Sequence, residues 1–499
     1  MALNLLNLPH DVLASIFEYL SVPGLCALSC TCRGMRDMIA EFGWTDYLRV
    51  HPPLPSYSLE KSRKSWDART IARYEYFTER NWETGNFVAR PLNTPWQTKL
   101  QPTLAINSSR LLVAAANTLV SYAFDSPKPR IRQDASWRLS DRFTSLTDVT
   151  ALACTEDPDV YIVGMWDGSI KRIVINPDDR QSSFQNHPAP SLQVTTTYQQ
   201  RDDGIESLVC EDNHLLSLTA TGRATLRNLS SPQNTISSIE LGARSWTSYL
   251  CTSASTPFAA FGTSSTSPLV LHRLLQDGSF APDTRVLDRT HAATLSQHMR
   301  SIPARPASSA CYAITRAPPA APWGASPELL VAGWYDGRVR LYDLRVASRY
   351  HYPRAPSPTD DDPDPPSPAP MLRPMLAMSD PWLYDPIYSV ACGGGAGAHI
   401  AAGSARHGVV CLWDMRYATR SGLSVHAPGN DASPVYKLAF ESSRLYGITD
   451  RRAFVFDWGQ HPTEDIYPFL PPRQGLKRKK GQRGPGFYVT KYVHDRHIG

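Results

Sequence analysis

The feature that most constrains this 499-residue chain is a motif that returns seven times after residue 100. Each copy begins with an alternating apolar stretch and a short loop. A second apolar stretch then ends in a small residue, and a tight turn connects it to a third stretch. An Asp-Gly or similar pair between two such stretches is the strongest short-range signal for a β-hairpin, because the favoured two-residue turns require positive φ. The clearest copies span residues 160–175, 329–345 and 399–416, and the fainter ones span 111–124, 215–229, 258–274 and 444–459.

The spacing of the copies indicates a ring of blades. The motif recurs about every 45 to 70 residues, which at its lower end is the period of a β-propeller, where each blade covers the face of the next. We therefore expect an all-β propeller over residues 83–460, with seven blades favoured and six or eight still open. A closed ring needs one strand from the other end of the domain, since an open ring leaves a raw edge. Residues 86–92 are the candidate for the outer strand of the last blade.

Proline-rich inserts explain the two longest intervals between copies. The chain has 42 prolines in 499 residues, well above the roughly 5% of ordinary proteins. One insert, APPAAPWGASP, spans residues 317–327, and the other spans residues 352–374 with nine prolines and four aspartates. We expect both to be mobile surface loops, because such segments bury too little apolar area to offset the entropy cost of ordering them.

The copies resemble WD repeats. The pair Trp413-Asp414 matches the signature of that family, and Tyr342-Asp343 and Phe456-Asp457 are variants of it. The Gly-His half of the signature is not evident, and several copies have drifted. The resemblance implies a WD-repeat-like propeller.

The first sixty residues have the pattern of short helices instead. Pro9 can occupy the first turn of a helix without losing a hydrogen bond, and apolar residues then recur at helical spacing through Leu20. A second start signal follows at residues 21–23, and a third helix runs toward Trp44. So small a unit rarely buries all of its apolar surface. We expect residues 1–45 to keep some surface for a partner, and residues 46–82 to form a helical linker to the propeller.

The segment LPHDVLASIFEYLSVPGLCALSCTCRGMRDMI resembles an F-box, which opens on Leu-Pro and an apolar helix and continues to a Cys-Arg step. It departs from many relatives at Gly34-Met35, where they have a Trp. The resemblance implies docking to the Skp-type adaptor of a cullin-based ubiquitin ligase, by the insertion of apolar helix anchors into a groove. The alternative is a helical hairpin that packs on its own chain. Carried over by position, the adaptor-binding residues are Leu8, Pro9, Val12, Leu13, Ile16, Leu20 and Leu25.

Net charge argues against a nucleic-acid-binding surface. The formal charge is +5, but residues 473–499 hold eight basic residues and one acidic residue, so that the preceding part sums to 43 − 45 = −2. A nucleic-acid surface needs its positive charge on the folded face, whereas here it lies in a basic tail, residues 461–499. The run LKRKKGQRG at residues 476–484 fits nuclear import or contact with an acidic surface, and a solvated disordered end is the alternative.

The remaining composition favours a cytoplasmic or nuclear protein without a membrane span. Nine cysteines show no Cys-x-x-Cys pair, no stretch reaches 18 apolar residues, and the amino terminus lacks the pattern of a signal peptide. The triplet Cys26, Cys30 and Cys32 has no fourth ligand nearby and is interpreted as core.

Catalytic motifs are missing from the sequence. There is no His-Glu-x-x-His, no Walker loop and no Gly-x-Ser-x-Gly elbow. The run GGGAGAH at residues 393–399 lacks the Lys that follows a phosphate-binding loop, and a flexible hairpin is the better interpretation. We therefore expect a non-enzymatic chain with no cofactor and no metal.

The candidate substrate-binding residues lie in the central turns of the repeats. In a propeller these turns emerge on one face. Aromatic side chains there would supply anchor surface, and Arg would pair with carboxylate or phosphate groups. The alternative is that such residues only solvate the surface and that Asp167, Asp336 and Asp450 brace their turns. The predicted binding rim consists of Trp166, Trp334, Tyr335, Arg338, Arg406, His407, Arg451 and Arg452.

The two resemblances together imply a substrate-recognition subunit of a Skp/cullin/F-box type ubiquitin ligase. The F-box would hold the adaptor, and the propeller would hold a target protein, with an acidic or phosphorylated target as an open alternative. Another hypothesis is a propeller scaffold in an assembly without ubiquitin transfer.

Overall fold

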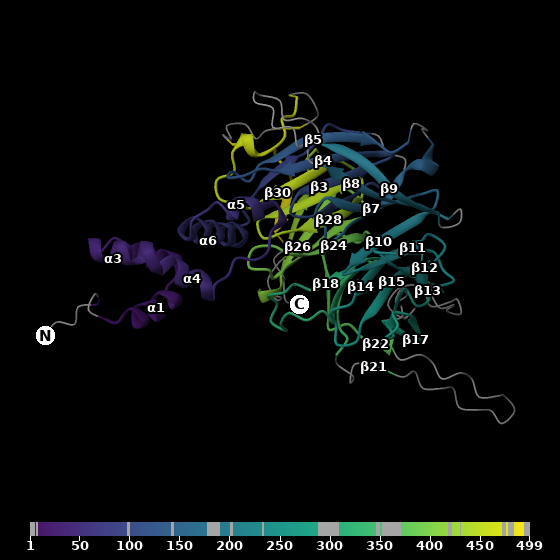
Figure 1. The fold of residues 1–499 in the computed structure, drawn as a ribbon, viewed down its shortest axis with the longest axis horizontal. Helices are drawn as coiled ribbons and strands as arrows, with labels where there is room; N and C mark the ends of the chain where they lie inside the picture. The colour runs from purple at the N-terminus through teal and green to yellow at the C-terminus, as the bar shows by residue number, and fades with distance from the viewer. Residues whose placement is uncertain are drawn as a thin grey trace.

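The computed structural model describes residues 5, 8–96, 100–140, 144–176, 190–199, 203–231, 234–287, 309–345, 350–351, 371–417, 422–429, 431–471, 476–477 and 484–493. A helical lobe at the amino terminus projects from a large β-propeller (Figure 1). The helices of this part are α1 (His10–Tyr19), α2 (Val22–Ser29), α3 (Arg33–Met38), α4 (Trp44–Val50), α5 (Glu60–Arg63) and α6 (Ala68–Thr84). A π-helical turn, η2 (Ile39–Gly43), connects α3 to α4, and a 3-10 turn, η3 (Tyr57–Leu59), precedes α5.

Residues at the helix starts fix where these helices begin, as the sequence indicates. Pro9 stands directly before α1, and the Ser21 side chain accepts a hydrogen bond from Gly24 N at the start of α2. The Cys32 Sγ accepts from Met35 N and caps α3, so this thiol acts at a helix start. Cys30 and Cys32 are exposed, which corrects the interpretation of the cysteine triplet as core. One apolar cluster joins α1, α2 and α4 to the first half of α6.

The described strands form six sheets, of which the ten-stranded one comprises two neighbouring blades. The resulting seven blades, each with four antiparallel strands at its centre, confirm the predicted propeller. Blade 1 consists of β2 (Thr103–Ile106), β3 (Arg110–Ala115), β4 (Thr118–Phe124) and β5 (Ile131–Arg138). Blade 2 consists of β6 (Val149–Cys154), β7 (Val160–Met165), β8 (Ser169–Asn176) and β9 (Ser191–Gln199). Blade 3 consists of β10 (Ile205–Glu211), β11 (His214–Thr219), β12 (Arg223–Asn228) and β13 (Thr235–Glu240).

The blades of the second half carry additional strands at their edges. Blade 4 consists of β14 (Ser245–Cys251), β15 (Phe258–Ser265), β16 (Leu269–Leu274) and β17 (Phe280–Leu287), extended by β22 (Met371–Leu372) and β21 (Tyr350–His351). Blade 5 consists of β18 (Ser309–Arg316), β19 (Leu329–Trp334), β20 (Arg338–Asp343) and β23 (Leu376–Ser379). Blade 6 consists of β24 (Ile387–Gly393), β25 (His399–Ser404), β26 (Val409–Asp414) and β27 (Leu423–His426), extended by β31 (Lys491–Val493).

Blade 7 closes the ring with a strand from the amino-terminal side of the domain. It consists of β28 (Val435–Phe440), β29 (Arg444–Thr449), β30 (Ala453–Asp457) and β1 (Val88–Pro91). β1 pairs antiparallel with β30, with Val88 opposite Asp457 and Pro91 opposite Phe454. This pairing confirms the candidate closing strand at residues 86–92. The innermost strand of blade 7, β28, also contacts the innermost strand of blade 1, β2.

The two faces of the propeller differ in what covers them. Turns between the second and third strands of the blades emerge on one face, here named the rim face. The loops that join first to second strands and third to fourth strands emerge on the opposite face, here named the linker face, where α6 packs. The Trp82 ring stacks on Trp458 with centroids 3.6 Å apart and donates to Ser442 O. The α6 helix is therefore packed both in the helical lobe and on the propeller.

The glycine run at residues 393–399 belongs to this docking and leaves little room for a phosphate. It connects β24 to β25 on the linker face, and Ala396 N donates to the Glu79 carboxylate of α6. A carboxylate at this backbone repels phosphate, so the structure favours the interpretation as a loop between strands.

Two expectations about irregular segments are corrected. The insert at residues 317–327 was expected to be a mobile loop, but Ala317 and Ala321 are buried in the core between blades 5 and 6, because small side chains fit where the loop crosses it. Residues 352–370 of the second insert lie outside the described residues. Near its end, Met371–Leu372 pair with blade 4. Part of the expected solvated tail also packs on the propeller, since β31 extends blade 6. The basic run lies outside the described residues from 478 to 483.

Candidate functional site

The rim face brings together the predicted turn residues of four blades. Tyr335 is 56% exposed, and Arg338, Arg406, His407 and Arg451 are exposed as well. Positive φ at His407 and at the turn glycines, such as 74° at Gly337, gives the tight turns that the sequence indicates. The rim face therefore presents an aromatic side chain and several cations to solvent.

Three of the predicted rim residues do not offer free side chains. Trp334 is 0% exposed, because it ends β19 with its ring turned into the core under the Arg340 guanidinium, 4.3 Å away. Arg452 is buried and forms an ion pair with Asp431 at 2.9 Å, since an unpaired buried cation would cost too much. Trp166 is half-buried. A position next to a turn thus does not by itself place a side chain on the surface.

The turn aspartates brace the backbone. Asp167 Oδ1 accepts from Ser169 N at 2.8 Å, and Asp336 Oδ1 accepts from Arg338 N at 3.3 Å. Asp336 Oδ2 also accepts from the Arg340 guanidinium at 2.6 Å. Asp450 differs, because it contributes its backbone N–H, which donates to Ser433 Oγ. The first two aspartates support their turns, in agreement with the structural alternative.

An aromatic half-ring at the mouth of the central channel was missed by the sequence analysis. In six blades the innermost strand shifts register near its start, and the residue skipped at each shift lines the channel. A residue in a β-bulge is released from the ladder and is re-aimed. The skipped residues are Trp246, Tyr312, Tyr388 and Tyr436 on one side, and Thr150 and Glu206 on the other.

The half-ring is continuous and carries charge at one end. Ring centroids lie 5.1 Å apart for Trp246 and Tyr312 and 4.8 Å apart for Tyr312 and Tyr388. The Arg244 guanidinium lies 4.1 Å from the Trp246 ring centroid and pairs with Glu206 at 2.8 Å. Burial raises the pKa of the Glu206 carboxyl, and Arg244 opposes that shift.

Exposed aromatics on the loop between β23 and β24 extend the rim face outward. Trp382 is 80% exposed and Tyr384 is 84% exposed. Arg406 Nε lies 3.8 Å from the Asp385 carboxylate of the same loop, so this loop lies beside the turn of blade 6. Large exposed aromatics mark protein-binding surfaces. The only sequence signal was the run DPWLYDP that follows the second insert.

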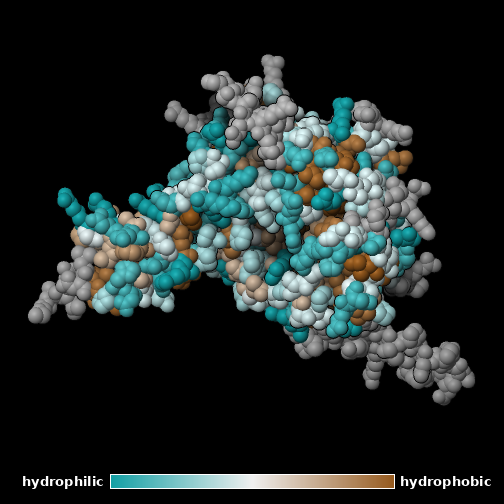
Figure 2. Space-filling view, viewed as in Figure 1, coloured by the Kyte–Doolittle hydropathy of each residue, from teal (hydrophilic) through white to brown (hydrophobic). Residues whose placement is uncertain are grey.

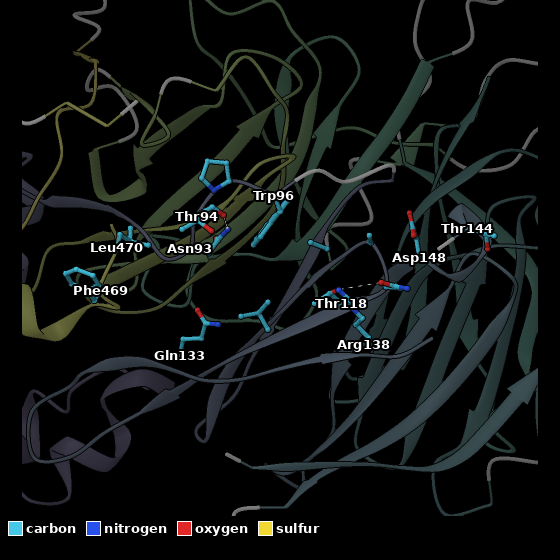
Figure 3. Close-up of a pocket in the computed structure, with 15 residues that line it drawn as sticks. Asn93, Thr94, Trp96, Thr118, Gln133, Arg138, Thr144, Asp148, Phe469 and Leu470 are labelled. Carbon is cyan, nitrogen blue, oxygen red and sulfur yellow. Dashed lines mark hydrogen bonds between the residues drawn. The ribbon is translucent and has the colours of Figure 1, made fainter. Parts of the chain in front are cut away.

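A cavity of about 520 Å³ lies at the edge of blade 1 (Figure 3). It is lined by Trp96, by the turn between β3 and β4, and by Phe469 and Leu470 from the segment after blade 7. Trp96 N donates to Arg451 O at 2.8 Å, which connects the cavity to the rim residue Arg451. Its mixed apolar and amide lining suits a peptide side chain.

The predicted adaptor-binding residues fall into an exposed set and a buried set. Pro9 and Val12 are exposed, and Leu8, Ile16 and Leu20 are partly buried. Leu13 and Leu25 are buried in the core of the lobe. The reason is helical spacing: Leu13 lies four residues before Phe17 on the inward face of α1, whereas Val12 and Tyr19 lie on its outward face.

The sequence of the helical lobe matches a known domain family. Residues 5–48 match the family model described as F-box-like. These residues therefore form an F-box-like domain. Figure 2 shows this domain as a lobe that carries apolar side chains among polar ones and projects away from the propeller. No curated protein matches the chain.

Solved structures resemble the propeller at low identity. One described as the structure of U3-55K has a TM-score of 0.47 at 13% identity and covers 74% of this chain and 98% of its own. The RRP9 WD40 repeats have a TM-score of 0.46 at 12% identity, with 75% and 100% covered. Chaetomium thermophilum Sqt1, bound to the N-terminus of ribosomal protein L10, has a TM-score of 0.45 at 12% identity, with 73% and 84% covered.

Two kinds of feature are absent from the described residues. Among them, no helix is long and apolar enough to cross a membrane, and no group of three or more His, Cys, Asp or Glu side chains could hold a metal ion. The F-box-like domain, together with the propeller, supports a role in protein interaction.

Proposed function

We propose that this chain is the substrate-recognition subunit of a Skp/cullin/F-box type ubiquitin ligase. The observation that carries the proposal is the F-box-like domain at residues 5–48, held by α6 on the propeller face opposite the rim face. An adaptor on the lobe and a target on the rim face could bind at the same time. The chain would contribute positioning, which raises the effective concentration of the target near a recruited enzyme.

The exposed face of α1 supports adaptor docking. Val12 is 40% exposed and Tyr19 is 85% exposed, and together with Pro9 they form an apolar stripe on the outside of the lobe. Isolated apolar stripes of this kind fit a groove on a partner helix bundle. The all-free state of the nine cysteines suits a reducing compartment, and we place the protein in the cytoplasm, the nucleus or both.

The rim face supports capture of a protein target. Aromatic anchors occur at Tyr335, Trp382 and Tyr384, and exposed cations occur at Arg338 and Arg406. Because Arg side chains pair well with carboxylate and phosphate groups, we propose an acidic or phosphorylated segment as the feature that is recognised.

Co-purification of the full chain with a Skp-type adaptor tests the ligase hypothesis. The wild type should retain the adaptor, and the double variant Val12→Asp/Tyr19→Asp should lose it, because charges would then face the groove. Both positions are exposed, so the fold should survive. The control Arg36→Glu, exposed on α3, should retain the adaptor. Failure of the wild type to retain it would leave a propeller scaffold without ubiquitin transfer as the better hypothesis.

Quantitative mass spectrometry of co-purified proteins tests the rim face. The triple variant Tyr335→Ala/Trp382→Ala/Arg406→Glu should lose proteins that the wild type captures while it keeps the adaptor. The control Arg80→Glu lies on the exposed side of α6, on the linker face, and should capture the same proteins as the wild type. Equal capture by the triple variant would exclude the rim face as the target site.

A further inference from the structure

The carboxy-terminal segment at residues 484–493 lies along the outer edges of blades 6 and 7. β31 pairs antiparallel with β27, with Lys491 opposite Val425 and Val493 opposite Leu423. Two residues of the segment before β31 also form backbone hydrogen bonds with the blades. Thr490 O accepts from His426 N, and Phe487 N donates to Ala89 O of β1, each at 2.9 Å. One short segment therefore satisfies backbone groups of two edge strands that would otherwise stay open.

Alternate side chains of the segment turn toward the propeller. The Arg90 guanidinium lies 5.0 Å from the Phe487 ring centroid, and Val489 packs against the apolar core of blades 6 and 7. Lys491 Nζ donates to Gly85 O at 3.1 Å and lies 5.7 Å from the Phe87 ring centroid. A spacing of two residues puts these three side chains on one face of an extended chain. The pattern that fits is aromatic, aliphatic and lysine at alternate positions.

The segment fills its groove incompletely. All three residues of β31 are exposed, with Val493 at 67%. A cavity of about 720 Å³ runs beside the segment along residues 85–89. A second cavity of about 550 Å³, lined by Trp382, Leu383 and Val409, opens beside Tyr492 and Val493. Both volumes are in the range of ligand pockets, so larger side chains would bury apolar surface that this segment leaves exposed.

We propose that the edges of β27 and β1 form a β-augmentation site for an extended segment of a partner protein, which residues 484–493 occupy in cis. The partner segment has an aromatic, an aliphatic and a lysine residue at alternate positions. Backbone pairing supplies affinity, and the alternate pockets supply specificity. Because the cis segment is tethered, a partner must compete with a high effective concentration. The paired edges belong to the outer strands of blades 6 and 7, and one end of the site borders the rim face at Trp382 and His407. The proposal does not depend on the ligase hypothesis.

A labelled decapeptide with the sequence of residues 484–493 tests the site on the full chain by fluorescence anisotropy. Val489→Asp in the chain should weaken the cis segment, and the peptide should bind this variant at least about tenfold more tightly than the wild type. The control Tyr488→Asp, on the outward face of the same segment, should bind the peptide as weakly as the wild type. Hydrogen exchange at the His426 amide should rise in Val489→Asp and fall again when the peptide is added.

Peptide variants and the oligomeric state decide the remaining outcomes. A peptide with Val493→Trp should bind more tightly than the native sequence, and peptides with Lys491→Glu or a scrambled order should not bind. The proposal is overturned if Val489→Asp binds no peptide at about 1 mM or binds the scrambled peptide equally. It is also overturned if light scattering shows the wild type as a dimer, because the occupant would then be the tail of a second copy.

Discussion

A single buried carboxylate joins the linker segment before α5 to the propeller. Glu441, in the loop between β28 and β29, accepts a hydrogen bond from Ser58 N at 2.9 Å and another from Ser58 Oγ. Burial raises the pKa of Glu441 above its ordinary value of 4.5, and the bonds from Ser58 oppose that shift. The folded protein therefore holds this proton more tightly than the unfolded chain does, so the linker contact depends on pH.

Glu441→Gln should remove that pH dependence. Because the pKa in the folded state is raised, the contribution of Glu441 is fully present below about pH 4.5 and is lost as the pH rises through the raised pKa. Chemical denaturation between about pH 4.5 and 7.5 should show that the wild type loses stability relative to E441Q with rising pH. Ser58→Ala should steepen the loss in the wild-type background, because it removes a donor to the charged form. A constant difference between wild type and E441Q would contradict this assignment.

The element that decides the shape of the molecule is α6. Ala72 of this helix packs in the F-box-like core, and Tyr74 and Trp82 pack on blade 7. A helix buried on two sides has few exposed positions, among them Arg73 and Arg80. Asp67 caps its start by accepting from Thr70 N, and Gly85 ends it with φ of 63°.

Trp82→Ala should destabilise the protein by about 3–5 kcal/mol, because it removes a large buried ring and leaves a cavity. It also removes the stack on Trp458 and the hydrogen bond to Ser442 O. Urea denaturation followed by fluorescence measures the loss. Arg80→Ala on the exposed side of the same helix should change the free energy of unfolding by less than about 0.5 kcal/mol. A small effect of Trp82→Ala would show that α6 is not firmly docked.

Regular elements were predictable from sequence where a local rule decides the outcome. Hairpins with turn residues such as Asp336-Gly337, and the closing strand at residues 86–92, follow from turn chemistry and from the need to cover an edge. The aromatic half-ring was not predictable, because a β-bulge is a register shift that shows only once strands pair. Trp334 and Arg452 were misplaced for a related reason, since neighbouring blades decide which side of a turn is covered.

At the scale of the whole molecule, the closure of the ring depends on one seam, the pairing of β1 with β30 in blade 7. β1 is the only part of blade 7 that comes from before blade 1 among the described strands, and Ala89 in it is buried. The carboxy-terminal segment crosses the same place, because Phe487 N donates to Ala89 O. Opening the ring therefore requires β1 to leave β30.

Ala89→Asp should open this seam, because it puts a charge into the closing strand without a partner. We expect a loss of about 3 kcal/mol or more in the free energy of unfolding. Hydrogen exchange should rise first in β28 and β2, on either side of the seam, and less in blades 3 and 4. Ser136→Asp, exposed on the outer strand of blade 1, is the control and should have little effect. A uniform rise in exchange over all blades would contradict closure by β1.

The double burial of α6 has a mechanical consequence. Because α6 packs in the core of the lobe and on the propeller, we expect the two parts to move together as one rigid body. A hinge between them would then not be available to shorten the distance from the lobe to the rim face. A protein held on the rim face must therefore reach around the thickness of the ring with its own chain. Under the proposed function, the length and slack of that chain would select which of its lysines are modified.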